Sequence, residues 1–544
     1  MLLNFLTTLT TQITYTMPII TKQLTYTHPD KEALFHDISF SVEKGDKVAI
    51  VGNNGVGKST LLKVIAGESF PSSGEVILSG QPYYVPQHFG QYSRLTIAQA
   101  LKIDRKLDAL HAILAGDASA ENFTILDDDW TIEERALGAL SLWGLDYVAL
   151  SQPMESLSGG EKTRVFLSGI AVHDPQIILM DEPTNHLDFA VRDKLYNLIE
   201  SSGATIVVVS HDRILLSKLS SIYELRKDEI VYYPGNYEFY KEQKEIEINS
   251  LQARLEDKEK ELRLARKTAR EAAERKQKHE VRGKKQNIKK GVGKMAMDTL
   301  QDKAEKSASK LKDVHRGKMD SIAGDIAGLQ AAIPDLKAMK TDFGESSLHT
   351  GKILVSAKDV NYAYGDKPLW NKPLNFTIKS GDRIAIKGNN GSGKTTLLKL
   401  VTGKLLPTEG AMVRADFSYV YLDQEYSIID DRLTVFEQAE QFAHGMCDYE
   451  IKSILNRFLF THDMWDKQCS RLSGGEKMKL ALCCLMLSAD TPDMFILDEP
   501  TNNIDIQNIG ILTATVRDYK GTVVVVSHDG YFVDEIGAEI NYEL

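Results

Sequence analysis

One long segment of this 544-residue chain occurs twice. The residues KVAIVGNNGVGKSTLLKVIAG at 47–67 return as RIAIKGNNGSGKTTLLKLVTG at 383–403. Three shorter segments return in the same order: LSGGEK at 157–162 and 472–477, DEPTN at 181–185 and 498–502, and VVVSHD at 207–212 and 524–529. A repeat on this scale indicates two copies of one domain, and each copy is long enough to bury its own core.

The repeats divide the chain into three parts. The first copy is expected over 1–236, with 1–16 as an extension that precedes a second candidate start at Met17. A connector over 237–350 and the second copy over 351–544 follow. The offset between the copies falls from 336 residues at the glycine-rich segment to 317 at the last segment, which predicts an insertion near 115–130 in the first copy.

Each copy alternates apolar strands with helical sequence. Runs such as VAIV, IILM and IVVV are uninterrupted and rich in β-branched residues, which is typical of strands buried on both faces of a parallel sheet. Polar motifs follow these runs directly, at the strand ends where open α/β sheets bind ligands. The expected fold is therefore α/β, with two P-loop domains joined by the connector.

The glycine-rich segments match the phosphate-binding pattern G-x-x-x-x-G-K-[ST] in full. Glycines let successive backbone N–H groups converge on phosphate oxygens at a helix N-terminus. Each lysine would reach the β- and γ-phosphates, and the Ser or Thr that follows would hold Mg²⁺. The predicted nucleotide-binding residues are Gly52, Asn53, Asn54, Gly55, Gly57, Lys58, Ser59 and Thr60, with Gly388, Asn389, Asn390, Gly391, Gly393, Lys394, Thr395 and Thr396.

Other motifs supply groups suited to phosphate hydrolysis. In each copy an Asp-Glu pair ends a buried strand, where the aspartate would orient the metal and the glutamate would act as general base on water. A histidine after the next strand would contact the γ-phosphate, although a histidine alone is more often structural. An upstream glutamine would sense Mg²⁺ and its water. These residues are Asp181, Glu182, His211 and Gln87 in the first copy and Asp498, Glu499, His528 and Gln424 in the second.

The LSGGE segments place a serine and two glycines at the start of a helix, which makes a second anion cradle in each copy. Because each copy already has one, the simplest expectation is that this cradle serves the nucleotide of the other copy. The two copies of one monomer would then pair head to tail, ATP binding would close them, and hydrolysis would release them. The residues are Ser158, Gly159 and Gly160, and Ser473, Gly474 and Gly475.

Glycine loop, glutamine, LSGG, DEP and SHD occur in this order twice, and in this the chain resembles the ATP-binding cassette superfamily. DEPTNHLD at 181–188, YYPGNYEFYKEQK at 232–244 and the absence of a membrane domain resemble its ABC-F branch. The resemblance covers both cassettes. It implies a cytoplasmic ATPase that uses ATP and Mg²⁺, has no stable membrane subunit, and binds the ribosome, its RNA and the tRNA of the exit site. Some members of the branch protect ribosomes from antibiotics.

The motifs of the two cassettes differ from each other in two places. The second reads DEPTNNID, with Asn503 and Ile504 where the first has His186 and Leu187, so the two sites are expected to differ in coupling. The aromatic residue that the resemblance assigns to adenine stacking is Tyr364 in the second cassette. The aligned residue of the first cassette is His28, where stacking is less certain.

The connector has a net positive charge, although the chain as a whole is acidic. The formal net charge is −11, yet residues 241–340 hold 26 Lys and Arg against 17 Asp and Glu. Apolar residues at 3-4 spacing predict two helices: Ile248, Leu251, Leu255, Leu262, Ala265, Ala269 and Ala272 before the middle, and Leu300, Ala304, Ser307, Leu311, Val314, Ile326, Leu329 and Ile333 after it. With a glycine-containing break at 283–293, they predict a long antiparallel hairpin whose first helix runs over about 237–281.

The charge gathers near the expected elbow at 282–297. The simplest alternative is a coiled coil whose charges only keep it soluble. However, positive charges concentrated in one segment repel each other and do not improve the packing of the helices. Contact with RNA phosphates would explain why the charges are concentrated despite this repulsion. The candidate RNA contacts are Arg282, Lys284, Lys285, Lys289, Lys290 and Lys294.

Composition narrows the remaining alternatives. The four cysteines are Cys447, Cys469, Cys483 and Cys484, and none forms a C-x-x-C pair, which argues against disulfide frameworks and zinc clusters. No run approaches the length of a membrane-spanning helix. A tandem ATPase subunit of a membrane importer remains open, although importer linkers are usually short. A DNA-repair ATPase fits less well, because such enzymes need cysteine zinc clusters or a cassette split by a far longer coiled coil.

Overall fold

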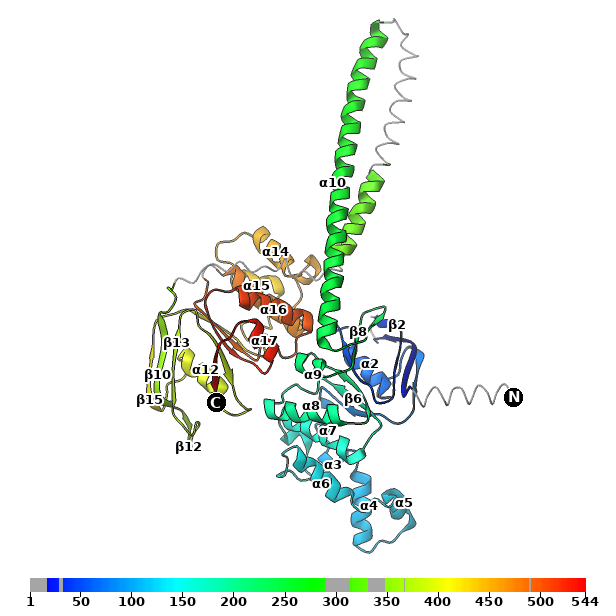
Figure 1. Cartoon of the computed structure of the whole chain (residues 1–544), viewed down its shortest axis with the longest axis vertical. Helices are drawn as coiled ribbons and strands as arrows, with labels where there is room; N and C mark the ends of the chain where they lie inside the picture. Colours follow the sequence, from blue (N-terminus) through cyan, green and yellow to red (C-terminus); the bar gives the residue numbers. More distant parts are fainter. Residues whose placement is uncertain are drawn as a thin grey trace, which may run out of the picture. The chain divides into compact units, whose positions relative to one another are not determined.

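The computed structural model describes residues 17–28, 33–289, 314, 316–330, 348–365, 367–488 and 491–544. The chain forms two compact units (Figure 1). The first unit contains both cassettes, with the chain up to Tyr240 and from Ala338 onward. The second unit is the middle of the linker, Lys241–Lys337.

The first cassette is built on a six-stranded sheet in the order β5-β6-β7-β3-β8-β9. All neighbours in this sheet are parallel except the β8–β9 pair. Alternate residues of a strand enter different cores: Ile206 and Val208 face one cluster, and Val207 and Val209 face the other. Burial on both faces explains why these strands read as uninterrupted apolar runs. The strands are β3 (Lys47–Val51), β5 (Tyr83–Val85), β6 (Ile177–Asp181), β7 (Thr205–Val209), β8 (Ser221–Leu225) and β9 (Ile230–Tyr233).

The second cassette repeats this plan with a five-stranded parallel sheet in the order β16-β17-β18-β14-β19. Val523 and Val525 of β18 face one core, and Val524 and Val526 face the other. The α/β fold with two similar domains is therefore as predicted. The strands are β14 (Arg383–Lys387), β16 (Tyr419–Leu422), β17 (Met494–Asp498), β18 (Thr522–Val526) and β19 (Ile540–Glu543).

A three-stranded antiparallel sheet accompanies each parallel sheet, in the orders β2-β1-β4 and β13-β10-β15. In the first cassette it shares a core with helix α2, through residues such as Phe35 and Leu62. In the second, Trp370 and Leu398 occupy the corresponding core. These strands are β1 (Ile19–Thr27), β2 (Ala33–Val42), β4 (Ser73–Leu78), β10 (Ile353–Asn361), β13 (Leu374–Lys379) and β15 (Glu409–Arg414), and the helices are α2 (Lys58–Ile65) and α12 (Lys394–Thr402).

The segment before each LSGGE motif differs between the cassettes. The first cassette holds α3 (Ile97–Ala100), α4 (Asp104–Leu114), α5 (Ala120–Leu126) and α6 (Ile132–Leu142) in this interval. The described part of the second holds α13 (Val435–Glu440) and α14 (Asp448–Arg457) with two short 3₁₀ turns. Helix α5 thus lies inside the segment where the sequence predicts an insertion.

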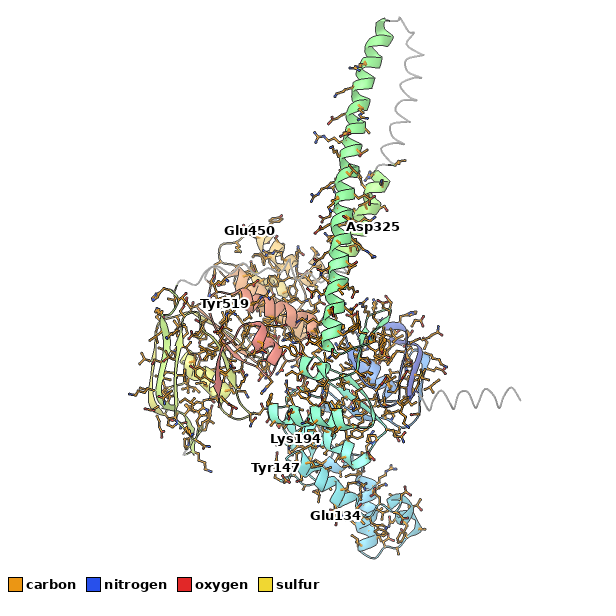
Figure 2. The ribbon with its side chains drawn as sticks, in the orientation of Figure 1. Glu134, Tyr147, Lys194, Asp325, Glu450 and Tyr519 are labelled. Carbon is orange, nitrogen blue, oxygen red and sulfur yellow. The ribbon has the colours of Figure 1, made fainter. Side chains whose placement is uncertain are left out.

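In the described part of the linker unit, a second helix over 316–330 lies beside helix α10 (Tyr237–Lys289). The predicted seam residues Leu251, Leu255 and Leu262 are half-buried. Lys258, which interrupts the seam, forms an ion pair with Asp325 at 3.0 Å, and Figure 2 labels Asp325 on the second helix. The charged position in the apolar seam is thus a cross-helix contact rather than a defect.

The predicted end of the first linker helix is wrong. The sequence predicts a helix to about 281 and a break from Gly283, but α10 continues through Gly283 to Lys289. One glycine costs a helix only about 1 kcal/mol relative to alanine, and the strong helix formers around it outweigh that cost. Leu300, Ala304, Ser307, Leu311 and Ile333 of the predicted seam, with Lys290 and Lys294 of the expected tip, lie outside the described residues.

Candidate nucleotide-binding sites

The two glycine-rich loops join a central strand to a helix. In the first cassette the loop runs from β3 to α2, and in the second from β14 to α12. Gly57 and Gly393 stand immediately before the helices with φ of 104° and 95°, a left-handed conformation that favours glycine. The free N–H groups of the first helical turn face the loop, and this is the geometry that binds phosphate.

Each loop lysine crosses its own loop. Lys58 Nζ donates to the carbonyl oxygens of Gly52 and Asn53 at 2.7 and 3.1 Å. Lys394 Nζ donates to the equivalent carbonyls of Gly388 and Asn389 at 2.8 and 3.0 Å. Burial lowers the pKa of Lys58, and the nearby Glu182, Asp505 and Asp181 oppose that shift. Both ammonium groups are thus held inside the loops, where a phosphate would bind.

A hydroxyl and a carboxylate meet beside each lysine. Ser59 Oγ donates to Asp181 Oδ1 at 3.0 Å, and Thr395 Oγ1 donates to Asp498 Oδ2 at 3.2 Å. The aspartates end β6 and β17, which are separated from the loop strands by one strand only. Hard oxygen donors of this kind, completed by phosphate oxygens and water, are what Mg²⁺ prefers, so the residues present fit a metal.

The glutamates that follow the aspartates are strained and buried. Glu182 and Glu499 adopt φ of 47° and 52°, a left-handed conformation that is uncommon outside glycine. Such strain tends to persist where the surrounding structure and function require it. Glu499 Oε1 lies 3.1 Å from His528 Nε2, and Glu182 Oε1 lies 3.3 Å from His211 Nε2. In the described part of the chain, Glu182 Oε1 and Glu499 Oε2 are buried oxygens that accept no hydrogen bond.

Burial also shifts the pKa values of a glutamate and a histidine in the first site. It raises the pKa of Glu182 to about 8, with Lys58 opposing the shift. Burial lowers the pKa of His211 well below its usual value, so its ring is neutral. A carboxyl with a pKa near neutrality, beside a neutral imidazole, is suited to accept a proton from water.

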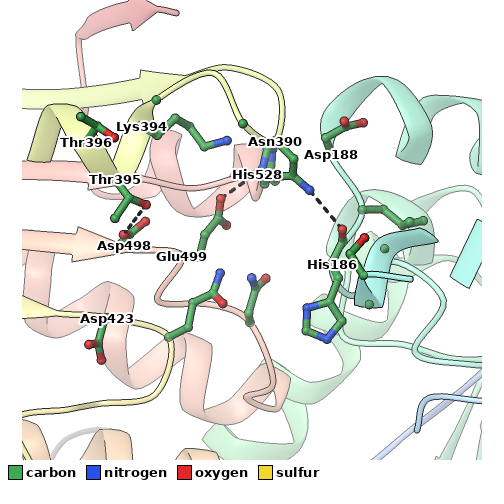
Figure 3. Close-up of a pocket in the computed structure, with 18 of the residues that line it drawn as sticks. His186, Asp188, Asn390, Lys394, Thr395, Thr396, Asp423, Asp498, Glu499 and His528 are labelled. Atoms are coloured by element: carbon green, nitrogen blue, oxygen red, sulfur yellow. Dashed lines mark hydrogen bonds and ion pairs between the residues drawn. The ribbon is translucent and has the colours of Figure 1, made fainter. Parts of the chain in front are cut away.

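Each site is completed by the other cassette. A cavity of 1290 Å³ is lined by Lys394, Thr395 and Gln424 of the second cassette and by Ser158, Gly159 and Gly160 of the first (Figure 3). A cavity of 340 Å³ is lined by Lys58, Ser59 and Gln87 of the first cassette and by Ser473 of the second. Three predicted signature residues of the first cassette thus line the cavity of the second loop, and Ser473 lines the cavity of the first loop.

The signature serines begin helices α7 (Gly159–His173) and α15 (Gly474–Leu487). Ser158 and Glu161 exchange hydrogen bonds in a capping box, and Ser473 and Glu476 do the same. This arrangement fixes the helix start and aims its first N–H groups outward. Gly474 and Gly475 follow Ser473 in that first turn.

The residues after the DEP motifs contact the opposite loop differently in the two sites. Asn390 Nδ2 donates to the carbonyl of His186 at 3.2 Å, as drawn in Figure 3. At the other site the backbone N–H of Asn54 donates to Asp505 Oδ2 at 3.1 Å, and Asn54 Nδ2 donates to the carbonyl of Asn503 at 3.3 Å. The hydrogen bonds between a glycine-rich loop and the opposite DEP segment thus differ between the two sites.

The two candidate adenine contacts differ as well. Tyr364 is 62% exposed at the wall of the larger cavity, and its hydroxyl shares a hydrogen bond of 3.1 Å with Thr396 Oγ1. His28 lines the smaller cavity, is exposed, and packs edge-on against Tyr26. Asn53, Gly55, Asn389 and Gly391 lie in the loops, and Thr60 lies in the first turn of α2.

One pair of residues near the sites is absent from the predicted set. Tyr84 and Tyr421 donate to the two metal-facing aspartates, Asp181 and Asp498. Each tyrosine stands three residues before its glutamine, in YYVPQ and YVYLDQ, so the repeats share the residue, but the sequence alone does not show its contact with the aspartate. Of the proposed RNA contacts, Arg282 is an exposed residue of α10, and Lys284, Lys285 and Lys289 belong to the same helix.

Comparison with known proteins agrees with this geometry. A family model described as "ABC transporter" matches residues 35–185 and 371–502. ABC transporter F family member 5 of Arabidopsis thaliana is 30% identical over 92% of this chain and 71% of its own length. The chain belongs to the ABC-F branch of the ATP-binding cassette family.

Other ABC-F-like relatives span nearly the whole chain. The uncharacterized ATP-binding protein YfmM of Bacillus subtilis is 30% identical over 95% of this chain and 96% of its own length. The ribosome protection protein VmlR of the same organism is 29% identical over 93% and 83%. The match therefore includes the linker that joins the cassettes, and not only the cassettes themselves.

A solved structure has the same fold. Archaeal aABCE1, described as a ribosome recycling factor and solved with a ribosomal stalk protein, aligns with a TM-score of 0.54 at 20% identity. The alignment covers 94% of this chain and 86% of that one. Among the residues that the structure describes, no helix of this ABC-F chain is long and apolar enough to cross a membrane.

Proposed function

We propose that the chain hydrolyses ATP to ADP and phosphate, with Mg²⁺, at two sites that its cassettes form together. One observation carries the proposal: each cavity combines the lysine loop of one cassette with the signature helix of the other. A nucleotide bound in such a cavity contacts both cassettes. Its binding energy therefore favours the closed pair, and its hydrolysis removes that contribution.

The roles of the site residues follow from their positions. The loop N–H groups, Lys58 and Lys394 bind phosphate oxygens. Ser59 with Asp181, and Thr395 with Asp498, hold the metal, which neutralises phosphate charge when bound. The glutamines Gln87 and Gln424 line the same cavities, where they would contact the metal and its water.

The proton of the attacking water goes to a glutamate. Glu182 and Glu499 each line one of the two cavities, and each has a buried carboxylate oxygen that accepts no hydrogen bond. His211 and His528 lie against these carboxylates and hold their orientation. Tyr364 stacks on the base at the second loop, and His28 takes that place at the first.

We propose further that the chain binds the ribosome and modulates translation from the cytoplasm, as a monomer whose cassettes close on each other. The similarity to VmlR, which is described as a ribosome protection protein, supports this. The net positive charge of the linker supports contact with ribosomal RNA and with tRNA at the exit site, through Arg282, Lys284, Lys285, Lys289, Lys290 and Lys294. Protection from an antibiotic is one form this modulation takes in the family.

The proposal is tested by two measurements on the full chain. ATP hydrolysis should depend on Mg²⁺, and the protein should sediment with purified ribosomes in the presence of ATP. Fractionation with membranes instead of ribosomes would contradict the ribosomal role and favour the ATPase subunit of an importer. Absence of Mg²⁺-dependent hydrolysis would contradict the enzymatic role.

A further inference from the structure

A tyrosine contacts the metal-facing aspartate in both cassettes. Tyr84 OH donates to Asp181 Oδ2 at 3.3 Å, and Tyr421 OH donates to Asp498 Oδ2 at 2.7 Å. Neither tyrosine belongs to a glycine-rich loop. Phosphate binding by the loops therefore does not explain why a tyrosine is present at these positions. The same contact made twice, from equivalent strands, indicates a shared task.

Strand register places each hydroxyl. Tyr84 of β5 pairs with Leu179 of β6, and Tyr421 of β16 pairs with Ile496 of β17. Asp181 and Asp498 lie two residues further along β6 and β17, on the same face of the sheet as those partners. The tyrosine ring therefore extends along the neighbouring strand and ends at the carboxylate. The contact is built into the parallel sheet and needs no loop to form it.

The carboxylates require such donors because they are buried. Asp181 is 1% exposed and Asp498 is 8% exposed. A buried carboxylate without donors would lose both its charge and its orientation.

We propose that Tyr84 and Tyr421 are positioning residues that orient Asp181 and Asp498 and thereby set the Mg²⁺ affinity of each nucleotide site. The inference rests on the proposed ATPase function and concerns the same sites. In the first site Ser59 and Tyr84 donate to different oxygens of the aspartate, so together they hold both. Residues that orient a metal ligand in this way typically change metal affinity about 10- to 100-fold.

The two sites should not depend equally on their tyrosines. In the second site Thr395 and Tyr421 donate to the same oxygen, and the tyrosine bond is the shorter one. Lys404 Nζ lies 5.2 Å from the centre of the Tyr421 ring and lines the same cavity. Loss of the Tyr421 hydroxyl should therefore have the larger effect.

The test is metal binding by Tyr84→Phe and Tyr421→Phe, which keep the ring and remove only the hydroxyl. Binding of Mn²⁺ to the full chain with a non-hydrolysable ATP analogue is followed by electron paramagnetic resonance. The apparent metal dissociation constant should rise about tenfold or more in each variant. Affinity for the analogue in the presence of EDTA should not change, which shows that the loops are intact.

Matched controls remove a buried tyrosine hydroxyl elsewhere. Tyr83→Phe loses a bond of 2.8 Å to the carbonyl of Phe166, one residue from Tyr84 but on the opposite face of the sheet. Tyr519→Phe loses a bond to the carbonyl of Pro492 in the second cassette. Both controls should bind Mn²⁺ as the unmodified chain does. If Tyr84→Phe and Tyr421→Phe also match it, the inference is wrong while the ATPase proposal stands. If the unmodified chain itself shows no metal-dependent binding, both are wrong.

Discussion

Arg213 of the first cassette donates twice to one carboxylate oxygen of Asp529 in the second. The Nε and Nη2 distances are 3.2 and 2.9 Å, and Nη1 donates to Glu535 at 2.8 Å. The arginine begins helix α9 (Arg213–Ser217) directly after the first SHD motif, Asp529 immediately precedes α17 (Gly530–Glu535), and Glu535 is the last residue of that helix. The residue that follows Asp529 is Gly530, so this contact has no counterpart in the other direction. Of the two SHD segments, only the first is therefore followed by an arginine that makes a buried contact with the other cassette.

Replacement of Arg213 should loosen the pair of cassettes. Its side chain is 3% exposed and packs over the ring of Tyr531. Removing one partner of a buried pair leaves the other charge uncompensated and typically costs about 3–5 kcal/mol. Arg213→Met should lower the free energy of unfolding by about that amount in a urea titration. Arg517→Met, at an exposed arginine of the second cassette, is the control. Equal stabilities for the two variants would contradict this account of the contact.

The two adenine positions should differ in importance. Stacking of a base on an aromatic ring is worth about 1–3 kcal/mol, so Tyr364→Ala should weaken ATP binding at the second loop about tenfold or more. A Lys58→Ala background isolates that loop for titration. His28→Ala in a Lys394→Ala background should cost less, because the exposed imidazole offers a smaller stacking surface. Equal losses would show that the residues are equivalent.

Buried thiols make the second cassette sensitive to alkali. Burial raises the pKa of Cys484 to about 12 and that of Cys483 well above its usual value. The folded chain therefore retains protons that the unfolded chain releases above about pH 9, so stability falls as the pH rises from there toward 12. Each thiol contributes about 1.4 kcal/mol per pH unit in this range.

The variant Cys483→Ala with Cys484→Ala should therefore show a flatter decline of unfolding free energy above pH 9. The measurement is a series of urea titrations between pH 8 and 11. Cys447→Ala, at an exposed cysteine, should keep the slope of the unmodified chain. A slope that the double variant leaves unchanged would mean that these thiols do not couple to folding.

The linker prediction concerns where the charge lies and not only how much there is. Replacing Lys284, Lys285, Lys289 and Lys290 with glutamine should weaken ribosome binding and reduce its dependence on salt, because fewer phosphates are neutralised. The control removes the same charge earlier in α10, at Lys241, Lys244, Lys260 and Lys267, and leaves the cross-helix pair of Lys258 intact. Salt titrations of ribosome sedimentation compare the two. If both variants bind ribosomes with the same affinity and salt dependence, the lysines at 284–290 serve solubility and not RNA binding.

Much of the site could be predicted because its residues are local to short motifs. Lys58, Ser59, Asp181 and their equivalents each follow a strand within a few residues, and parallel strands bring their carboxyl ends to one edge. The LSGGE segments are assigned to the opposite cassette because each cassette already has one anion-binding loop. The residues that line the two cavities are consistent with this assignment.

What escaped prediction depends on register and on three-dimensional contact. Tyr84 reaches Asp181 only because β5 pairs with β6 in one register, which no local pattern shows. In the sequence, Lys258 interrupts an apolar seam without an evident reason. The structure shows that it forms an ion pair with Asp325 of the other helix. Gly283 suggests a break in the helix, yet α10 continues through it. Extending a helix that has already formed is favourable enough to outweigh the cost of one glycine.

The central claim is that ATP joins the cassettes and that two glutamates release them. It is tested most directly by Glu182→Gln with Glu499→Gln, since glutamine keeps the shape of the side chain but cannot take the proton from water. The double variant should bind ATP as tightly as the unmodified chain, show no turnover, and remain with ribosomes after sedimentation in ATP. Hydrolysis at the rate of the unmodified chain, or retention of ATP without retention on ribosomes, would contradict the account.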